Sequence, residues 1–183
     1  MGRLIKILVI GLLGIALWQA YAPYIINKDD VEWVHGNVVY VTPDQVVDLV
    51  KKSYGKPSVV YIYASWCTTC AYVTPLLMEK IKSGQLSNMQ LIFVAMEKEV
   101  YDLSHYLVSK DYARQFTPYI MKEPMGDSLK PLGGKTVLGI PYLGFYDAFG
   151  SAVYEHAGVI SQDELDAVVS RVSGLALHMN VKP

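Results

Sequence analysis

The sequence predicts a single α/β domain preceded by an apolar N-terminal segment. Between residues 38 and 172, short runs rich in β-branched and aromatic residues alternate with segments of helical spacing. Such alternation is typical of a sheet covered by helices. The 183 residues suffice for one sizeable hydrophobic core but hardly for two. Because no repeat or Gly/Ser-rich linker divides residues 30–183, we expect one domain there.

The composition excludes two classes of protein. Hydrophobic residues make up 52% of the chain and charged residues 18%, which is too apolar for an intrinsically disordered protein. The formal net charge is -1, and the basic residues form no dense cluster after Lys6. We therefore expect no binding of nucleic acid, which requires a basic surface.

The first 26 residues have the layout of an exported protein. Arg3 and Lys6 precede Ile7 to Trp18, twelve residues without a polar side chain, and the first acidic residue is Asp29. Basic residues followed by an apolar run are typical of a secretory signal or signal-anchor. The weakly polar stretch from residue 7 to residue 26 spans 20 residues. At about 1.5 Å per residue it is long enough to cross a hydrocarbon core roughly 30 Å thick.

Two fates of this segment follow from its last residues. Ala20-Tyr21-Ala22 has the small-x-small pattern of a signal-peptide cleavage site, but Pro23 follows it directly, which favours retention. We expect residues 1–28 to form a transmembrane signal-anchor, with the positive-inside rule placing the rest of the chain outside the cytoplasm. The alternatives are secretion after cleavage near Ala22 and a buried core helix.

The domain is predicted to open with a short strand and a helix. Val38 to Val41 is a β-branched run. Thr42 then has the residue type of an N-cap, and Pro43 suits the first helical position. Gly55-Lys56-Pro57 is expected to end this helix.

A central strand and a kinked helix follow. Ser58 to Ala64 is almost continuously apolar, which favours a strand covered on both faces. A helix is predicted from Cys70 to about Gly84, with Pro75 as a kink, and a second buried strand over Gln90 to Met96.

The remaining elements are less sharply marked. Their expected ranges are a helix over 100–116, a strand over 119–121, a turn or short helix over 127–132, a hairpin of strands over 141–147 and 152–156, and a helix over 162–172 with Ser161 as N-cap.

Cys67 and Cys70 are the candidate reactive residues. They are two residues apart and lie where a buried strand gives way to a helix. The free N–H groups and the positive dipole end of a helix N-terminus favour a thiolate at Cys67, which makes it the candidate nucleophile. Cys70, one turn into the helix, would resolve a mixed disulfide formed at Cys67.

Two other roles of the cysteine pair are possible from the spacing alone, a structural disulfide and a metal site. A structural disulfide would close a short loop and so stabilise the fold little. A zinc site would need about two further ligands. The sequence holds no third cysteine, and its four histidines are scattered, so we expect no metal site and no cofactor besides a redox-active disulfide.

Several motifs together resemble thioredoxin. They are Gly55-Lys56-Pro57, Ala64-Ser65-Trp66-Cys67-Thr68-Thr69-Cys70, Pro75, Gly139-Ile140-Pro141, Tyr146-Asp147 with Gly150, and Ala157-Gly158 before Gln162 to Val172. The resemblance covers about residues 37 to 175. The long segment over about 99–136 resembles the insertion of the TlpA/ResA type of membrane-anchored, periplasmic thiol-disulfide oxidoreductases. The resemblance implies a thioredoxin fold, a central mixed β-sheet flanked by helices, with this insertion before the strand that follows the proline.

The resemblance also assigns roles to residues around the cysteines. Pro141 corresponds to a cis-proline that faces the cysteine pair, and the backbone of Ile140 to the strand edge that pairs with substrate. Trp66 flanks the nucleophile, and Tyr142, with Tyr72 and Trp66, is expected to form an aromatic rim for substrate binding.

The chain departs from thioredoxin at the residues that move protons and tune the potential. Tyr61 stands where thioredoxin has a buried acid, so the usual proton acceptor for Cys70 is missing. Glu97 and Glu99 are the candidate substitutes, as proton shuttles. Thr68-Thr69 replaces the Gly-Pro between the cysteines of thioredoxin, at positions that set the reduction potential.

The expected function is thiol-disulfide exchange with thiol- or disulfide-bearing proteins, in the direction of reduction. The resemblance implies a single-pass protein of a bacterial inner membrane with its domain in the periplasm, a membrane electron donor, and a role such as cytochrome c maturation. The alternatives are delivery of Cu(I) bound by the two thiolates and a non-catalytic interaction domain on the same scaffold.

Overall fold

The computed structural model describes residues 11, 27–53, 55–122 and 139–179. Its elements, in chain order, are α2 (Lys28–Asn37), β1 (Val39–Val41), α3 (Pro43–Lys52), β2 (Ser58–Tyr63), α4 (Cys70–Lys82), β3 (Gln90–Ala95), α5 (Val100–Ser109), β4 (Pro118–Met121), β5 (Tyr142–Tyr146), β6 (Ala152–Ala157) and α6 (Gln162–Met179).

The strands form one mixed sheet in the order β1-β4-β3-β2-β5-β6. The first four strands in this order run parallel to one another, whereas β5 is antiparallel to both β2 and β6. Tyr63 pairs with Ala95 at the end of β2, and Ile62 pairs with Tyr142 at the start of β5. The ends of β2 and β3 and the start of β5 therefore meet at one edge of the sheet.

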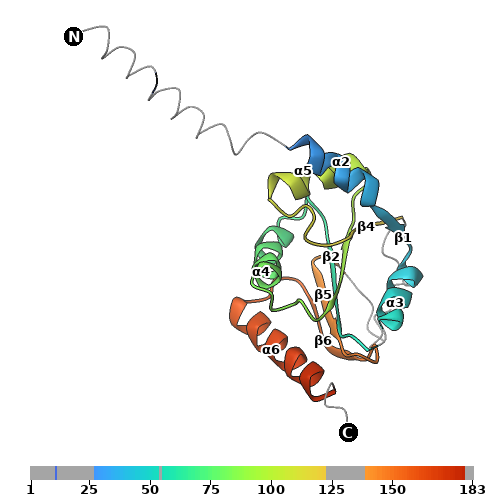
Figure 1. The fold of residues 1–183 in the computed structure, drawn as a ribbon, viewed down its shortest axis with the longest axis vertical. Helices are drawn as coiled ribbons and strands as arrows, with labels where there is room; N and C mark the ends of the chain where they lie inside the picture. The colour runs from blue at the N-terminus through green and yellow to red at the C-terminus, as the bar shows by residue number, and fades with distance from the viewer. Residues whose placement is uncertain (1–10, 12–26, 54, 123–138, 180–183) are drawn as a thin grey trace, which may run out of the picture.

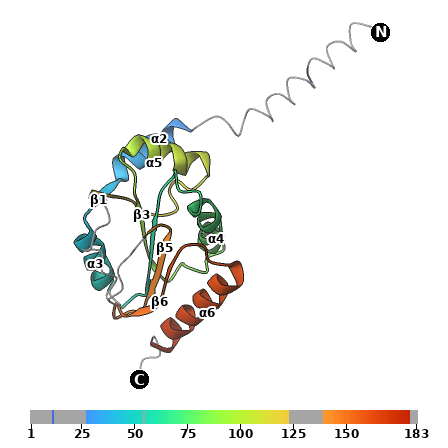
Figure 2. The same ribbon diagram turned by 180° about the vertical axis from the view of Figure 1, so that it is seen from behind.

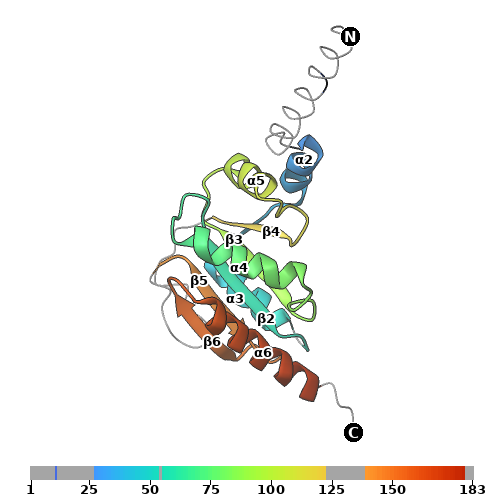
Figure 3. The same ribbon diagram turned by 90° about the vertical axis from the view of Figure 1, so that its left-hand side faces the viewer.

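Helices cover both faces of the sheet. Helix α3 lies on one side, and α4 and α6 lie on the other (Figures 1 and 2). Figure 3 shows α4 and α6 in front of the sheet, on the same face. In all three views α2 and α5 lie side by side at one end of the domain, and they are in contact.

Two hydrophobic clusters fill the space between these layers. Tyr61 and Phe93 belong to the cluster under α4, α5 and α6, whereas Ile62 and Val94 belong to the cluster under α3. Successive residues of β2 and β3 thus alternate between the two clusters, as the pleat of a strand requires. This explains why their sequences are apolar throughout.

Local capping residues fix the starts of two helices as the sequence predicted. Thr42 Oγ1 accepts a hydrogen bond from the N–H of Gln45, and Gln45 Oε1 accepts one from the N–H of Thr42. This capping box, with Pro43 at the first position, starts α3. Ser161 Oγ accepts the N–H of Glu164 at the start of α6. The helix α6 continues to Met179, beyond the expected end at residue 172.

Helix α2 was not predicted from the sequence. It has only one buried side chain, that of Val34, and a weak apolar face. It contacts a residue distant in the chain: Arg114 Nε donates to Asp30 at 2.6 Å, and the guanidinium lies 5.6 Å from the centre of the Trp33 ring. Contacts between residues this far apart leave no local signal in the sequence.

Helix α5 is shorter than expected. Apolar spacing predicted a helix to Phe116, but α5 ends at Ser109. Asp111 and Arg114 adopt φ angles of 56° and 65°, in the left-handed region that interrupts a right-handed helix. The apolar residues beyond Ser109, among them Phe116, still pack into the core from a turn.

Three expectations fall wholly or partly on residues outside the described ones. These are the signal-anchor over 1–28, the turn over 127–132 and the later part of the insertion over 99–136. The described part of that insertion provides α5 and β4, and β4 lies between β1 and β3 in the sheet. Among the described residues, no helix has the length and apolarity needed to cross a bilayer.

Candidate active site

Cys67 and Cys70 lie where β2 runs into α4. They form a disulfide with their Cα atoms 5.2 Å apart. Cys70 is the first residue of α4 and is fully buried, whereas Cys67 lies before the helix and is 9% exposed. Cys67 is therefore the more exposed of the two cysteines and the one nearer the surface.

The start of α4 directs backbone donors toward Cys67. The Cys67 Sγ accepts a hydrogen bond from the N–H of Cys70 at 3.1 Å. The first turn of α4 holds no acidic residue that would offset the positive end of the helix dipole. In the reduced protein this arrangement favours the thiolate form of Cys67.

The Ile140–Pro141 peptide bond is cis. Because Tyr142 pairs with Ile62, Pro141 stands at the sheet edge where β2 leads into the cysteine loop. Pro141 is buried, and its carbonyl oxygen accepts a hydrogen bond from the N–H of Gly158. The cis bond was expected from the motif, and the strand register gives its place beside the loop.

Of the three residues expected to form an aromatic rim, two are exposed and one is buried. Trp66 is 66% exposed and Tyr72 is also exposed. Tyr142, by contrast, is 4% exposed and belongs to the cluster under α3, on the opposite face from Cys67. Its hydroxyl donates to Glu155 Oε1 at 2.7 Å. The alternation of β5 places the Tyr142 side chain there, so it does not join the rim.

Tyr61 occupies a fully buried position next to α4. Its hydroxyl is 2.9 Å from Thr74 Oγ1, which in turn donates to the carbonyl oxygen of Cys70. Burial raises the pKa of Tyr61 above its usual value of 10.0. Tyr61 is therefore a neutral phenol at ordinary pH and cannot accept a proton from Cys70.

Tyr63 extends this buried tyrosine cluster. Its ring stacks on that of Tyr61, with centroids 5.2 Å apart. Burial also raises the pKa of Tyr63, and its hydroxyl has no hydrogen-bond partner within the part of the chain that the structure describes. Strand β2 thus directs two buried tyrosines into the cluster beneath α4 and α5, and the Tyr61 hydroxyl stands where the resemblance to thioredoxin implies a carboxylate.

The structure separates the two candidate glutamates. Glu97 is 5% exposed, and its Oε1 accepts a hydrogen bond from the N–H of Ser65 at 2.5 Å. The parallel register of β2 and β3 brings these two residues together just beyond the strand ends. Glu99 is exposed and directly precedes α5. Glu97 therefore adjoins the cysteine loop, whereas Glu99 lines neither of the hollows described next.

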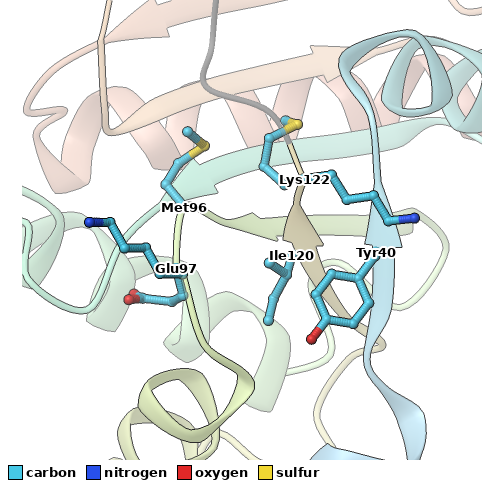
Figure 4. A pocket seen from close by; sticks show the side chains of 7 residues that line it. Tyr40, Met96, Glu97, Ile120 and Lys122 are labelled. Carbon is cyan, nitrogen blue, oxygen red and sulfur yellow. The ribbon is translucent and has the colours of Figure 1, made fainter.

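Two hollows meet at Glu97. One, of about 580 Å³, lies between the cysteine loop and α5. The other, of about 680 Å³, lies at the carboxyl ends of β1, β3 and β4. Figure 4 shows Tyr40, Met96, Ile120 and Lys122 around this second hollow. Sequence reasoning named neither hollow, because each is lined by residues distant in the chain.

Metal-ligand side chains do not gather in the described parts of the domain. Over residues 27–53, 55–122 and 139–179, no three His, Cys, Asp or Glu side chains lie in a group that could hold a metal ion. His35 instead lies 3.2 Å from Ser104 Oγ, and His156 lies 2.8 Å from the carbonyl oxygen of Val159.

Comparisons with known proteins identify the fold. No protein-family model and no curated protein matches the sequence. Solved structures do match. A thiol:disulfide interchange protein of the thioredoxin family from Chlorobium tepidum is 22% identical, with a TM-score of 0.53 over 66% of this chain and 82% of that chain. DsbF of Mycobacterium tuberculosis is 24% identical, with a TM-score of 0.52 over 67% and 84% of the two chains.

A third similar structure is a secreted disulfide oxidoreductase of Mycobacterium tuberculosis, described as homologous to Escherichia coli DsbE. It is 23% identical, with a TM-score of 0.50 over 66% of this chain and 84% of that chain. At these identities the likeness concerns the fold. The chain has a thioredoxin-like fold, a mixed sheet flanked by helices, as the sequence predicted.

Proposed function

We propose that this protein is a thiol-disulfide oxidoreductase that exchanges disulfides with partner proteins and uses the cysteine pair as its redox group. One observation carries the proposal. The disulfide joins a slightly exposed cysteine, just before a helix N-terminus, to a fully buried cysteine at the first position of that helix. A disulfide that only staples a fold has no need of this difference in access or of a backbone donor to one sulfur.

The exchange proceeds in two steps in the direction of reduction. The Cys67 thiolate attacks one sulfur of the partner's disulfide, forms a Cys67–partner bond and releases the partner's other sulfur as a thiolate. The Cys70 thiolate then attacks Cys67, closes the internal disulfide and releases the second partner thiolate. Two electrons pass from the cysteine pair to the partner, and the released thiolates take up two protons.

The residues around Cys67 have distinct parts in this scheme. The backbone of Ile140, held by the cis bond to Pro141, pairs with the extended partner segment. The exposed ring of Trp66 packs against that segment next to the reacting sulfur. Thr68 and Thr69, between the two cysteines, contribute to the reduction potential. Glu97 holds the loop through Ser65 and is the candidate proton shuttle.

The proposed direction of electron transfer and the proposed cellular location rest on more than the fold. Reduction, with electrons from a membrane donor, is supported by the resemblance to anchored oxidoreductases of the TlpA/ResA type. A location outside the cytoplasm is supported by the residue pattern of the N-terminal segment and by the solved structure of a secreted oxidoreductase with this fold.

The reduction potential of the Cys67/Cys70 pair, measured on the purified protein against glutathione and dithiothreitol, tests the proposal. A potential near about -270 mV supports a reductase, whereas one near about -120 mV indicates an oxidant. Reduction of a protein disulfide is expected to be abolished in Cys67→Ala. Activity that survives this substitution sinks the proposal. Retention of one Cu(I) per reduced protein, with no two-electron titration, would support the copper-delivery alternative instead.

A further inference from the structure

The hollow between the cysteine loop and α5 lies directly beside the reactive sulfur. Ser65 and Trp66, the two residues before Cys67, form one wall. The opposite wall is α5. The lining residues from α5 are Tyr101, Asp102, His105, Tyr106 and Ser109, and Glu97 lies between the two walls. A partner that presents its cysteine to Cys67 therefore places its neighbouring side chains at this opening.

The walls of this hollow combine exposed aromatic rings with carboxylates. Trp66 is 66% exposed and Tyr101 is 63% exposed, so each ring offers a bare face to a ligand. Asp102 is exposed as well, while the carboxylate of Glu97 is buried next to Ser65. None of the eight residues that line the hollow is Lys or Arg.

This lining favours a cation over other side chains. Lys and Arg side chains bind to the faces of Trp and Tyr rings and are attracted by a nearby carboxylate. An anionic side chain would meet Asp102 and Glu97 and be repelled. An apolar side chain could contact the rings but would gain no attraction from the carboxylates.

We propose that this hollow binds a lysine or arginine side chain of the partner protein, located close in sequence to the cysteine that reacts with Cys67. The inference rests on the proposed function and adds its substrate class: disulfide-bearing segments with a basic residue near the cysteine. It also gives α5 a role, as the second wall of the substrate site opposite Trp66.

The rate at which Cys67 forms a mixed disulfide with a peptide tests whether the hollow prefers a basic side chain. Full-length protein with Cys70→Ser, reduced beforehand, is mixed with short peptides whose single cysteine is joined to thionitrobenzoate. Cys67 attacks the peptide sulfur, the peptide–thionitrobenzoate bond breaks, and the coloured thionitrobenzoate anion leaves. The peptides differ at one position, two residues from the cysteine, which is Lys, Gln or Glu.

The Lys peptide is expected to react about fivefold faster than the Gln peptide, and the Glu peptide more slowly than both. In the same background, Asp102→Asn and Tyr101→Ala should each reduce the ratio of the Lys rate to the Gln rate. Asp102→Lys should make the Glu peptide the fastest. In the protein that retains Asp102, the ratio of the Lys-peptide rate to the Gln-peptide rate should also fall as the salt concentration rises.

Two matched substitutions control for general effects of charge and aromatic loss. Asp48→Asn changes an exposed acid on α3, on the other face of the sheet, and Phe149→Ala removes an exposed ring in the turn between β5 and β6. Both should keep the wild-type ratio. Equal rates for the three peptides would overturn this inference alone. No reaction with any peptide would overturn the proposed function, and this inference with it.

Discussion

Glu97 Oε1 accepts a hydrogen bond from the backbone N–H of Ser65, 32 residues earlier in the chain. The bond joins the ends of two neighbouring parallel strands at the loop that carries Trp66 and Cys67. Because Glu97 is buried, the N–H of Ser65 has little water to turn to if the carboxylate is removed. This pair therefore ties the position of the reactive loop to the core.

Substitution Glu97→Ala is expected to lower the free energy of unfolding by about 1 to 3 kcal/mol, the usual cost of leaving a buried donor unsatisfied. Glu97→Gln keeps an acceptor oxygen and should cost less. Denaturant unfolding of the oxidised proteins measures both. If Glu97 also shuttles protons, Glu97→Gln should slow protein-disulfide reduction while retaining most of the stability. An equal loss of stability in the two variants would contradict the role assigned to the hydrogen bond.

Tyr61→Phe is expected to leave the rate of disulfide exchange within about twofold of wild type. Burial keeps the Tyr61 phenol neutral, so it does not act as the proton acceptor that thioredoxin has at this position. The loss of its hydrogen bond with Thr74 should cost about 0.5 to 1.5 kcal/mol of stability. Stopped-flow reduction of a protein disulfide checks the rate. A tenfold decrease would show that the phenol takes part in the chemistry.

The stability of the domain is expected to fall steeply above pH 10. Burial raises the pKa of Tyr61 and of Tyr63 above 10.0, so the folded protein keeps protons that the unfolded chain releases. Their contribution is complete below pH 10 and is lost as the pH rises further. Each buried tyrosine then lowers the free energy of unfolding by about 1.4 kcal/mol per pH unit.

Urea unfolding at several pH values between 8 and about 11 measures this slope. Tyr61→Phe should make this loss of stability with pH less steep, because one buried tyrosine no longer contributes to it. Tyr72→Phe, which changes an exposed ring, is the matched control and should leave it unaltered. An unchanged slope in Tyr61→Phe would show that this phenol ionises in the folded protein.

Gly144→Ala is expected to destabilise the protein by about 1 to 3 kcal/mol through overpacking. A Cβ atom at this position would lie 2.7 Å from Cε2 of Tyr146 and 3.0 Å from the hydroxyl of Tyr142. The two hydroxyls lie 2.7 Å apart, and both lie within hydrogen-bond distance of Glu155 Oε1, so the rings have little freedom to move. Gly36→Ala in α2, where the added atom meets nothing within 4 Å, is the control and should be neutral or mildly stabilising. Thermal unfolding of both variants checks the difference.

Local chemistry allowed much of the site to be predicted. The capping box at Thr42, the apolar run of β2 and the spacing of Cys67 and Cys70 are each contained in a few consecutive residues. The cis bond before Pro141 was implied by the resemblance of Gly139-Ile140-Pro141 to thioredoxin. The start of α4 at Cys70 and the thioredoxin-like fold followed from these signals.

Sequence-based expectations failed or stayed open where contacts between residues far apart in the chain determine the structure. Helix α2 packs against α5 and contacts Arg114, which is 84 residues from Asp30 in the chain. Glu97 and Glu99 were equal candidates until the register of β2 and β3 brought only Glu97 to Ser65. The face on which Tyr142 lies was settled by the packing of β5, which places this side chain in the cluster under α3.

The sequence by itself determined the reactive pair, its place between a strand and a helix, and the class of fold. Only the tertiary structure decided which acid adjoins the cysteine loop, which aromatic rings remain exposed, and that α5 forms a second wall beside Trp66. The physical reason is the distance along the chain over which each kind of interaction acts. Capping, periodicity and cysteine spacing act within one or two turns of chain, whereas strand register and side-chain burial are set by residues that meet only after folding.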